Sequence, residues 1–396
     1  MTPKQKNFII VSVTPWDFEY GSNVRDISQE LSKNHRVLFV NIPMKRTELR
    51  SSKKKWTEDR KSVIQSKKNH YKKVNSNYHI VTTPVIFEPI NRLKPSFLFD
   101  LLNKTNNKRY AKAIQQAAKD FDFEEYYLIN DNDFYSGFYL PDYLIPIKSI
   151  YYLRDNFRAM NYWRTHSDRL EPRLITKYDL TLTNSVYLAN YAAAFNTSAK
   201  YVGQGCDIDY FLQATKDVEK PEDMKSINGP TIGYIGALNS ERLDIGLIKF
   251  LAEDNPTYQF VLVGPEDQNF KTSDLHQVNN VHFLGSKDFS LLNEYLQSFD
   301  VCINPQAINP ITIGNYPRKI DEYLAVGKPV VASYTETMTP FETVTYLSKN
   351  KKEFSENIRK ALAENDESKT KARIALASDH TWKNSVDLML KYITQS

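Results

Sequence analysis

Residues 312–331 contain the side chains of this sequence that are best placed to do chemistry. Pro317 suits the first turn of a helix, where its missing N–H group is not needed, so the sequence predicts a helix from about Pro317 to Val326. Lys319 would lie in that first turn, beside free N–H groups that attract anions. Glu322 would follow three residues later, on a neighbouring part of the same face.

This pair of charges suits a nucleoside diphosphate. A lysine and free N–H groups can neutralise phosphates, and a carboxylate can accept two hydrogen bonds from a ribose. Gly314, in the loop before the helix, would let a ligand approach the backbone closely. The same spacing also fits an ordinary amphipathic helix on which Lys319 and Glu322 form an exposed ion pair, and the pattern alone leaves both interpretations open.

The elements that would position these residues alternate between strands and helices. Their apolar character is continuous, which is typical of parallel strands buried between two layers of helices. Two successive arrays predict an α/β protein with two Rossmann-like domains. The expected strands lie at 8–13, 37–43, 78–84, 126–130, 149–155 and 180–185 in the first array, and at 231–238, 258–265, 281–285, 300–305 and 329–333 in the second.

A polar segment at 212–229 without periodicity predicts the connection between the domains. We therefore expect an N-terminal domain at 1–212 and a C-terminal domain at 213–380. Residues 381–396 space their apolar side chains as one face of a final helix.

Bulk composition limits the class of protein. Two isolated cysteines, Cys206 and Cys302, fit a reducing compartment or two buried positions, and they do not predict a zinc site. The apolar run at 8–13 is too short for a signal peptide, and no stretch approaches the ~20 apolar residues of a membrane span. We expect a cytoplasmic protein.

Charge is concentrated in the first half of the chain. Residues 44–73 hold 12 basic and 3 acidic side chains, including Lys53, Lys54 and Lys55. An apolar cluster at 95–102 is flanked by further basic residues, so that 92–109 resembles a helix resting on a bilayer. The basic segment could attract anionic lipid or nucleic acid, and the alternative is a solvated loop beside a core helix.

The segment around Lys319 resembles the donor-site signature of GT-B glycosyltransferases in the group related to family 4. It is similar to the form P-x-K-x-x-E-Y-L-A-x-G-K-P-V-V of bacterial exopolysaccharide and teichuronic-acid-type enzymes. Further similarity lies at 231–238, 260–265, 283–285 and 292–301, and at Gly205, Cys206, Asp207, Phe211, Thr381 and Trp382. The resemblance implies two domains facing across a cleft, a C-terminal helix that crosses back to the first domain, and donor-binding residues Gly236, Arg242, Gly314, Asn315, Lys319 and Glu322.

The sequence departs from the family pattern at two donor positions. Gly314 stands where many relatives have a second glutamate, and Ala237 stands where an arginine is usual, although Arg242 lies nearby. These departures leave open whether transfer would retain or invert the anomeric configuration.

The resemblance also implies residues on the acceptor side. Trp16 and Asp17 resemble the first βα loop of the family, which a sugar approaches. Asp155 follows an expected strand, and in similar inverting enzymes an aspartate there is the general base. The alternative for Asp155 is a helix N-cap. His166 is a second candidate base, with a core or surface histidine as the alternative.

The resulting hypothesis is a glycosyltransferase that uses a nucleoside-diphosphate sugar, with a UDP-sugar favoured. The resemblance implies a glycan acceptor linked to polyprenyl diphosphate. We expect the protein to rest on the anionic inner face of the plasma membrane through residues 44–73 and 92–109, and not to bind nucleic acid. We expect no cofactor and no metal, because the Asp-x-Asp pattern at residues 131–133 lies outside the expected donor domain. The alternatives are a sugar-nucleotide epimerase of the same fold and a non-enzymatic protein that binds anionic surfaces through residues 44–73.

Overall fold

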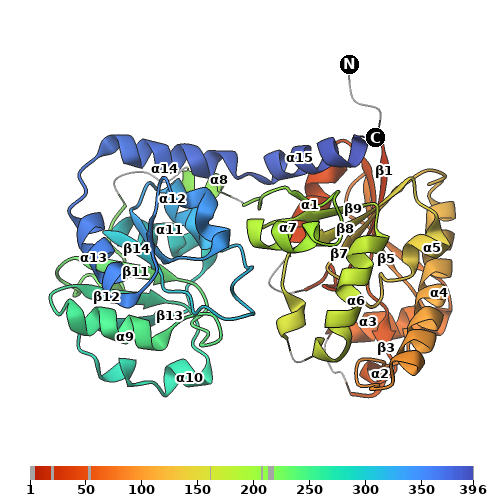
Figure 1. Ribbon diagram of the computed structural model, residues 1–396, viewed down its shortest axis with the longest axis horizontal. Coiled ribbons are helices and arrows are strands. Elements are labelled where there is room, and N and C mark those ends of the chain that lie inside the picture. The colour runs from red at the N-terminus through yellow and green to blue at the C-terminus, as the bar shows by residue number, and fades with distance from the viewer. Residues whose placement is uncertain are drawn as a thin grey trace. The chain divides into compact units, whose positions relative to one another are not determined.

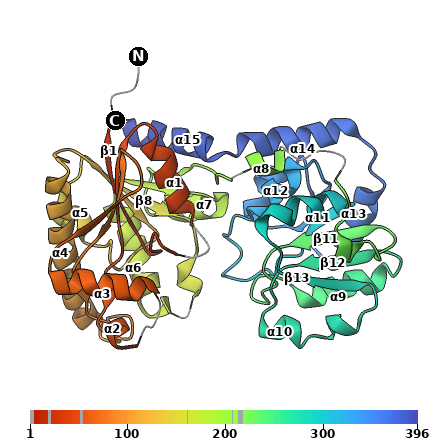
Figure 2. The same cartoon turned by 180° about the vertical axis from the view of Figure 1, so that it is seen from behind.

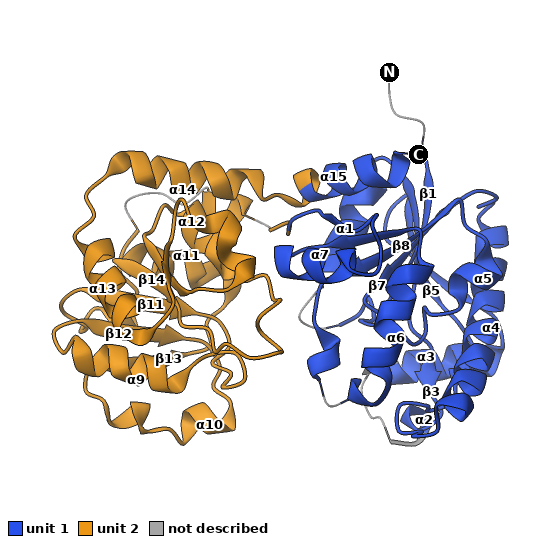
Figure 3. Cartoon of the chain, in the orientation of Figure 1, with its two compact units in different colours: residues 1–203, 385–396 blue, residues 204–384 orange. Residues whose placement is uncertain are grey.

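The computed structural model describes residues 5–18, 22–51, 55–160, 162–206, 208–212 and 218–395. The chain divides into two compact units, unit 1 at 1–203 with 385–396 and unit 2 at 204–384 (Figure 3). The domain limits predicted from sequence, after residues 212 and 380, lie nine and four residues from these. Lys53, Lys54 and Asp207 lie outside the described residues.

Unit 1 is built on an eight-stranded sheet in the order β10-β9-β8-β7-β1-β2-β5-β4. All neighbours are parallel except β4 and β5. Helix α1 (Asn23–Ser32) packs on β2 and β5 (Figure 2), and α4 (Ser96–Asp120) contributes Tyr110 and Ile114 to a core with β1 and β2. The strands are β1 (Asn7–Ser12), β2 (Arg36–Val40), β4 (His70–Lys73), β5 (Tyr78–Thr82), β7 (Tyr127–Asp131), β8 (Lys148–Leu153), β9 (Leu180–Thr183) and β10 (Lys200–Tyr201).

Unit 2 has a six-stranded parallel sheet in the order β13-β12-β11-β14-β15-β16. Helices α9 (Ile245–Asp254) and α13 (Lys351–Leu362) cover one face, and α11 (Leu292–Ser298), α12 (Lys319–Ala325) and α14 (Glu367–Asp379) pack on the other (Figure 1). The strands are β11 (Thr231–Ile235), β12 (Gln259–Val263), β13 (Val281–Gly285), β14 (Val301–Asn304), β15 (Val330–Ser333) and β16 (Tyr346–Ser348).

The expected α/β class with parallel sheets in two domains is confirmed. Most strands are buried along their length, as the continuous apolar runs require. The last helix, α15 (Trp382–Thr394), starts in unit 2 and continues into unit 1, where Ser385 Oγ donates to the Val202 carbonyl oxygen at 3.2 Å. In the described part of the chain, no helix combines the length and the apolar character needed to cross a membrane.

Two features differ from the sequence-based expectation. The basic segment contains an edge strand, β4, whose lysines keep the sheet edge soluble. Helix α12 begins at Lys319 rather than at Pro317, and the Pro317 carbonyl oxygen accepts the first bond, from Ile320 N at 2.9 Å. Boundaries of this kind depend on cap geometry, which the sequence does not specify.

Candidate functional site

In unit 2 the strand order reverses between β11 and β14. Ligands of open α/β sheets bind where the carboxyl ends of such strands diverge. Gly236 directly follows β11 with φ of +142°, a conformation that side chains rarely allow, and its N–H group donates to the Val263 carbonyl oxygen at 2.9 Å. The loop that follows β14 leads through Gly314 to Lys319, so the predicted donor residues are placed by these two strands.

Lys319 lies over the backbone turn at Gly236. A Cβ atom at residue 236 would lie 3.4 Å from Lys319 Nζ and 3.0 Å from the Tyr234 hydroxyl oxygen. The ammonium also lies 4.9 Å from the centre of the Tyr234 ring. Among the described residues, Lys319 forms no ion pair. A positive charge is therefore held against the glycine turn, in space that a side chain at residue 236 would crowd.

Glu322 does not pair with Lys319 within the described part of the chain, so the exposed ion pair considered above does not form. The half-buried carboxylate makes no hydrogen bond to a described residue. Burial raises the pKa of Glu322, while Arg318 and Lys319 act in the opposite direction. A ligand that supplies hydroxyl donors would satisfy this carboxylate.

The other predicted donor residues lie in the two adjoining loops. Arg242 has an exposed side chain, and its carbonyl oxygen accepts from Ala307 N at 2.9 Å, which joins the loop after β11 to the loop after β14. Gly314 and Asn315 are buried in the second loop, where Asn315 N donates to the Thr312 carbonyl oxygen at 3.0 Å. These bonds give the carboxyl edge of the sheet a fixed shape.

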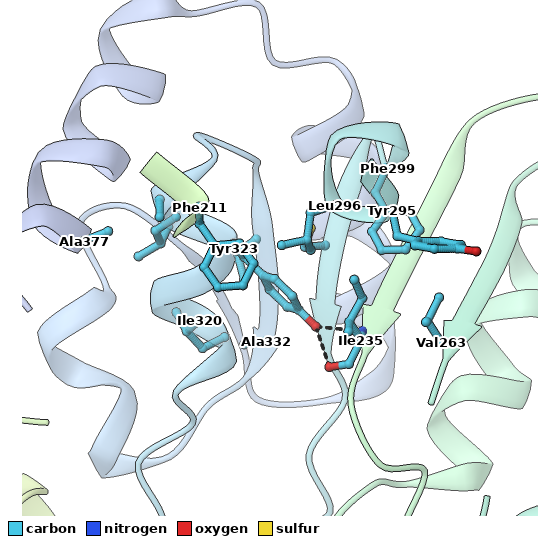
Figure 4. Close-up of a cluster of buried hydrophobic side chains, with 14 of the residues drawn as sticks. Phe211, Ile235, Val263, Tyr295, Leu296, Phe299, Ile320, Tyr323, Ala332 and Ala377 are labelled. Carbon is cyan, nitrogen blue, oxygen red and sulfur yellow. Dashed lines mark hydrogen bonds between the residues drawn. The ribbon is translucent and has the colours of Figure 1, made fainter. Parts of the chain in front are cut away.

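Tyr323 is a supporting residue that the sequence analysis missed. Its hydroxyl oxygen accepts from Ile235 N at 3.0 Å, as Figure 4 shows, and so fastens α12 to the end of β11. The tyrosine is fully buried in the core between the sheet and α12. Its place in the family-like motif was visible, but its bond to a strand 88 residues away was not.

In unit 1, Asp155 belongs to an ionic network at the carboxyl ends of β1, β7 and β8. Its carboxylate pairs with Arg154, whose Nε lies 2.8 Å from Asp131 Oδ1. Arg154 also donates to Thr14 Oγ1 at 3.0 Å, and Ser12 Oγ donates to Asp131 Oδ2 at 2.6 Å. Burial lowers the pKa of Arg154, but Asp131 and Asp155 outweigh it and hold that pKa above its usual range.

This network shows what surrounds the predicted base. Asn156, rather than Asp155, is the N-cap residue of the following 3₁₀ turn. The Asp155 side chain is 28% exposed, so a substrate can reach its carboxylate. Arg154 and Asp131 were not singled out from sequence as site residues, because their meeting depends on strands β7 and β8 being neighbours.

His166 is buried in the core of unit 1. It is 3% exposed, its Nε2 lies 2.6 Å from the Leu93 carbonyl oxygen, and its ring lies 4.0 Å from that of Phe99. Burial lowers its pKa. A histidine this buried, with Nε2 bonded to the backbone, favours the core alternative over a catalytic base.

Trp16 and Asp17 line a cavity of about 300 Å³ in unit 1. Asp17 pairs with Arg60 at 2.9 Å, and Trp16 N donates to Asn41 Oδ1 at 2.9 Å. Lys72 Nζ lies 4.8 Å from the Trp16 ring centre. An aromatic face among charged and amide groups suits a sugar, whose ring has apolar faces and polar edges.

Comparisons with known proteins bear on this geometry. Residues 229–364 match the family model described as glycosyl transferases group 1. The chain is 27% identical over 233 residues to TuaH of Bacillus subtilis (strain 168), assigned as a teichuronic acid biosynthesis glycosyltransferase; the match covers 56% of this chain and 58% of TuaH. The matched part thus spans about three fifths of that relative's length.

Solved structures share the fold across the whole chain. HepE of Anabaena in complex with UDP has a TM-score of 0.65 at 17% identity, with 98% of this chain and 99% of that chain covered. Alpha,alpha-trehalose 6-phosphate synthase of Burkholderia multivorans has a TM-score of 0.71 at 10% identity, with 98% of each chain covered. Residues 229–364 thus match the glycosyl transferases group 1 family model, and the whole chain shares the two-domain GT-B fold.

Proposed function

We propose that the protein is a glycosyltransferase that moves a sugar from a nucleoside-diphosphate sugar to a glycan acceptor in bacterial cell-surface polysaccharide synthesis. The observation that carries the proposal is the placement of Lys319 over the Gly236 turn, with the Glu322 carboxylate on the same helix and without a hydrogen-bond partner among the described residues. The family match of this segment and the assignment of TuaH support the reaction class.

Unit 2 would bind the donor. Lys319, with Arg242 and the backbone around Gly314 and Asn315, would neutralise the diphosphate as it departs, and Glu322 would hold the ribose. UDP is the favoured nucleotide, because HepE, which shares the fold, was solved with UDP and with UDP and glucose. A lysine that supplies the positive charge removes the need for a metal ion at the diphosphate.

Unit 1 would bind the acceptor. The acceptor oxygen attacks the anomeric carbon, the bond from that carbon to the diphosphate breaks, and the diphosphate leaves with the electron pair. Asp155 would take the acceptor's hydroxyl proton. Arg154 pairs with Asp155 and so orients its carboxylate. Trp16 and Asp17 would contact the sugar of the acceptor from their cavity.

The acceptor would be lipid-linked and the protein cytoplasmic, attached to the inner face of the plasma membrane. Phe97 and Leu101 lie near the start of α4, one turn apart on one face, and their side chains are 71% and 62% exposed. Four exposed basic side chains flank them: Arg92, Lys94, Lys104 and Lys108. Apolar side chains with cations beside them are the pattern of an interfacial anchor on anionic lipid.

A thermal-shift screen against UDP, GDP, ADP, CMP and dTDP tests the donor site. A ligand that binds only the folded state at 100 times its Kd adds about 2.7 kcal/mol to the stability, which raises Tm measurably. We expect UDP to give the largest shift and Glu322→Ala to abolish it. Glu253 is an exposed glutamate at the carboxyl end of α9. Glu253→Ala is the control and should keep the shift.

Two outcomes would contradict the proposal. An equal shift in Glu322→Ala would remove the ribose role. No shift with any nucleotide would favour the alternative of a protein that binds anionic surfaces without catalysis.

A further inference from the structure

A second carboxylate lies directly beside Glu322 and faces the opposite way, into the core of unit 2. Asp321 is fully buried. One oxygen, Oδ1, lies 2.6 Å from His380 Nδ1, and the other accepts from the Tyr316 hydroxyl at 2.8 Å and from Cys206 Sγ at 3.1 Å. The Tyr316 hydroxyl is also 3.1 Å from His380 Nδ1. Both oxygens of Asp321 are therefore engaged, and the four side chains form one polar cluster.

The members of this cluster come from segments that are distant in sequence. Tyr316 ends the loop of Gly314 and Asn315, and Asp321 lies in α12. Cys206 and His380 belong to the two segments by which the chain passes between units 1 and 2. These segments join each other, since Cys206 N donates to the His380 carbonyl oxygen at 2.9 Å and Cys206 pairs with Thr381.

The same two segments support the residue before Lys319. The Arg318 guanidinium lies 5.8 Å from the Trp382 ring centre. Trp382 in turn packs so tightly on Gly205 that an added Cβ there would lie 2.4 Å from the indole. The start of α12 therefore rests on both crossing segments, through Arg318 as well as through Asp321.

Stability does not account for this cluster well. A buried ionic group costs desolvation energy, and apolar side chains of the same shape are often equally stable or more stable in its place. Hydrogen bonds do fix direction, however, and those of Asp321 set the position of α12 on one side. Tyr323 fixes the other side through Ile235 (Figure 4). Lys319 and Glu322 project from the helix that is held between these two fastenings.

We propose that Asp321 and His380 are a positioning pair for the donor site, which hold α12 and the loop at Gly314 in the conformation that binds the nucleotide. The inference rests on the proposed function, because it concerns the same donor site. Tyr316 transmits the constraint to the loop, and neither member of the pair touches the donor.

The test compares the affinity of four full-length variants for UDP by calorimetry, well below the Tm of each. His380→Leu removes the bond to Asp321, and we expect the Kd to rise about tenfold, as for a lost bond to a charged group. His380→Asn keeps an N–H donor near the position of Nδ1 and should stay within about threefold of wild type. Tyr316→Phe removes one oxygen only and should weaken binding while the protein remains folded.

His282→Leu is the control for removing a half-buried histidine from unit 2. His282 bonds to Gln259 at 2.7 Å near the amino ends of β13 and β12. The proposed donor residues follow the carboxyl ends of the strands, so the loss of His282 should leave the Kd unchanged. A Kd that is unchanged in His380→Leu and Tyr316→Phe would overturn the inference and leave the proposed function intact. A wild type that binds no nucleotide would overturn both.

Discussion

Lys319 and Glu322 carry opposite charges on one short helix, and within the described part of the chain they do not pair. The amine instead lies over the Gly236 turn, and the carboxylate has no hydrogen-bond partner among the described residues. Residues kept apart in this way give up about 0.2–0.5 kcal/mol of helix stabilisation that an ion pair would provide. A substrate that bonds to both charged groups would gain more binding free energy than this loss.

Replacing the Lys319 amine tests its role in the departure of the diphosphate. In Lys319→Gln we expect kcat/KM to fall about 10²- to 10³-fold, the usual effect of losing one group that stabilises developing charge. Unfolding free energy should change by less than about 1 kcal/mol, because the lysine has no ion pair among described residues. Steady-state transfer assays and thermal melts provide the two measurements.

The controls for Lys319→Gln address charge and metal. Lys249→Gln on α9 removes an equal charge from unit 2 and should retain activity. Excess EDTA should leave the wild-type rate unchanged if Lys319 does the work of a metal. A Lys319→Gln enzyme with the wild-type rate would exclude this residue from the reaction.

Asp155 is tested by a substitution that keeps its shape. Asp155→Asn retains an oxygen that Arg154 can donate to but cannot take a proton at neutral pH, so kcat should fall about 10²- to 10⁴-fold. The Kd for UDP should not change, because the proposed nucleotide site lies in unit 2. Turnover at the wild-type rate would mean that another group is the base.

At the scale of elements, α6 (Arg164–Lys177) holds the segment that follows Asp155. Glu171 of α6 is buried, and its carboxylate lies 3.0 Å from Arg158 Nε and accepts from the Tyr151 hydroxyl at 3.1 Å. Arg158 stacks on Tyr191 at 3.9 Å. These contacts fasten the 3₁₀ turn at Phe157–Ala159 to the helix, two residues beyond the proposed base.

Burial raises the pKa of Glu171 to about 7, with Arg158 opposing the shift. In the unfolded chain this carboxyl has a pKa near 4.3, so between that value and about 7 the folded state keeps a proton that the unfolded state has lost. Stability should therefore fall as pH rises through this window, by up to about 1.4 kcal/mol per unit, and level off above it. Urea unfolding from pH 4.5 to 8 measures this slope.

Glu171→Gln does not titrate at residue 171 and should lose this slope between pH 4.5 and 7. A variant with the same pH dependence as wild type would assign the slope to other groups.

The sequence predicted most strands because they are buried between two layers and so carry continuous apolar runs. It did not predict β4, whose exposed lysines follow no apolar pattern, or β16, which is only three residues long. The charged residues proposed for the donor site were visible in the α12 motif. The bonds of Asp321 to His380 and of Arg154 to Asp131 were not, because each joins residues that only the folded chain brings together.

At the scale of the molecule, the net positive charge lies in the first half of the chain. Residues 1–215 have a net charge of +10 and residues 216–396 a net charge of −5. In unit 1, Phe97 and Leu101 add an apolar pair to this positive half. An acidic donor half and a basic, partly apolar acceptor half are what an enzyme would need if its acceptor were held in an anionic membrane.

Flotation with liposomes tests this surface. Phe97→Asp with Leu101→Asp replaces the apolar pair by two anions, so we expect binding to vesicles of phosphatidylglycerol and phosphatidylcholine to be lost. Both side chains are largely exposed, at 71% and 62%, so the Tm should change little.

Phe195→Asp, at 39% exposure in another part of unit 1, is the control and should float like wild type. Wild type should release vesicles at high salt, since Lys94 and Lys104 act through screened charge. Equal flotation of the double variant would confine membrane attraction to the basic segment 44–73, and no flotation of wild type would place the acceptor in solution.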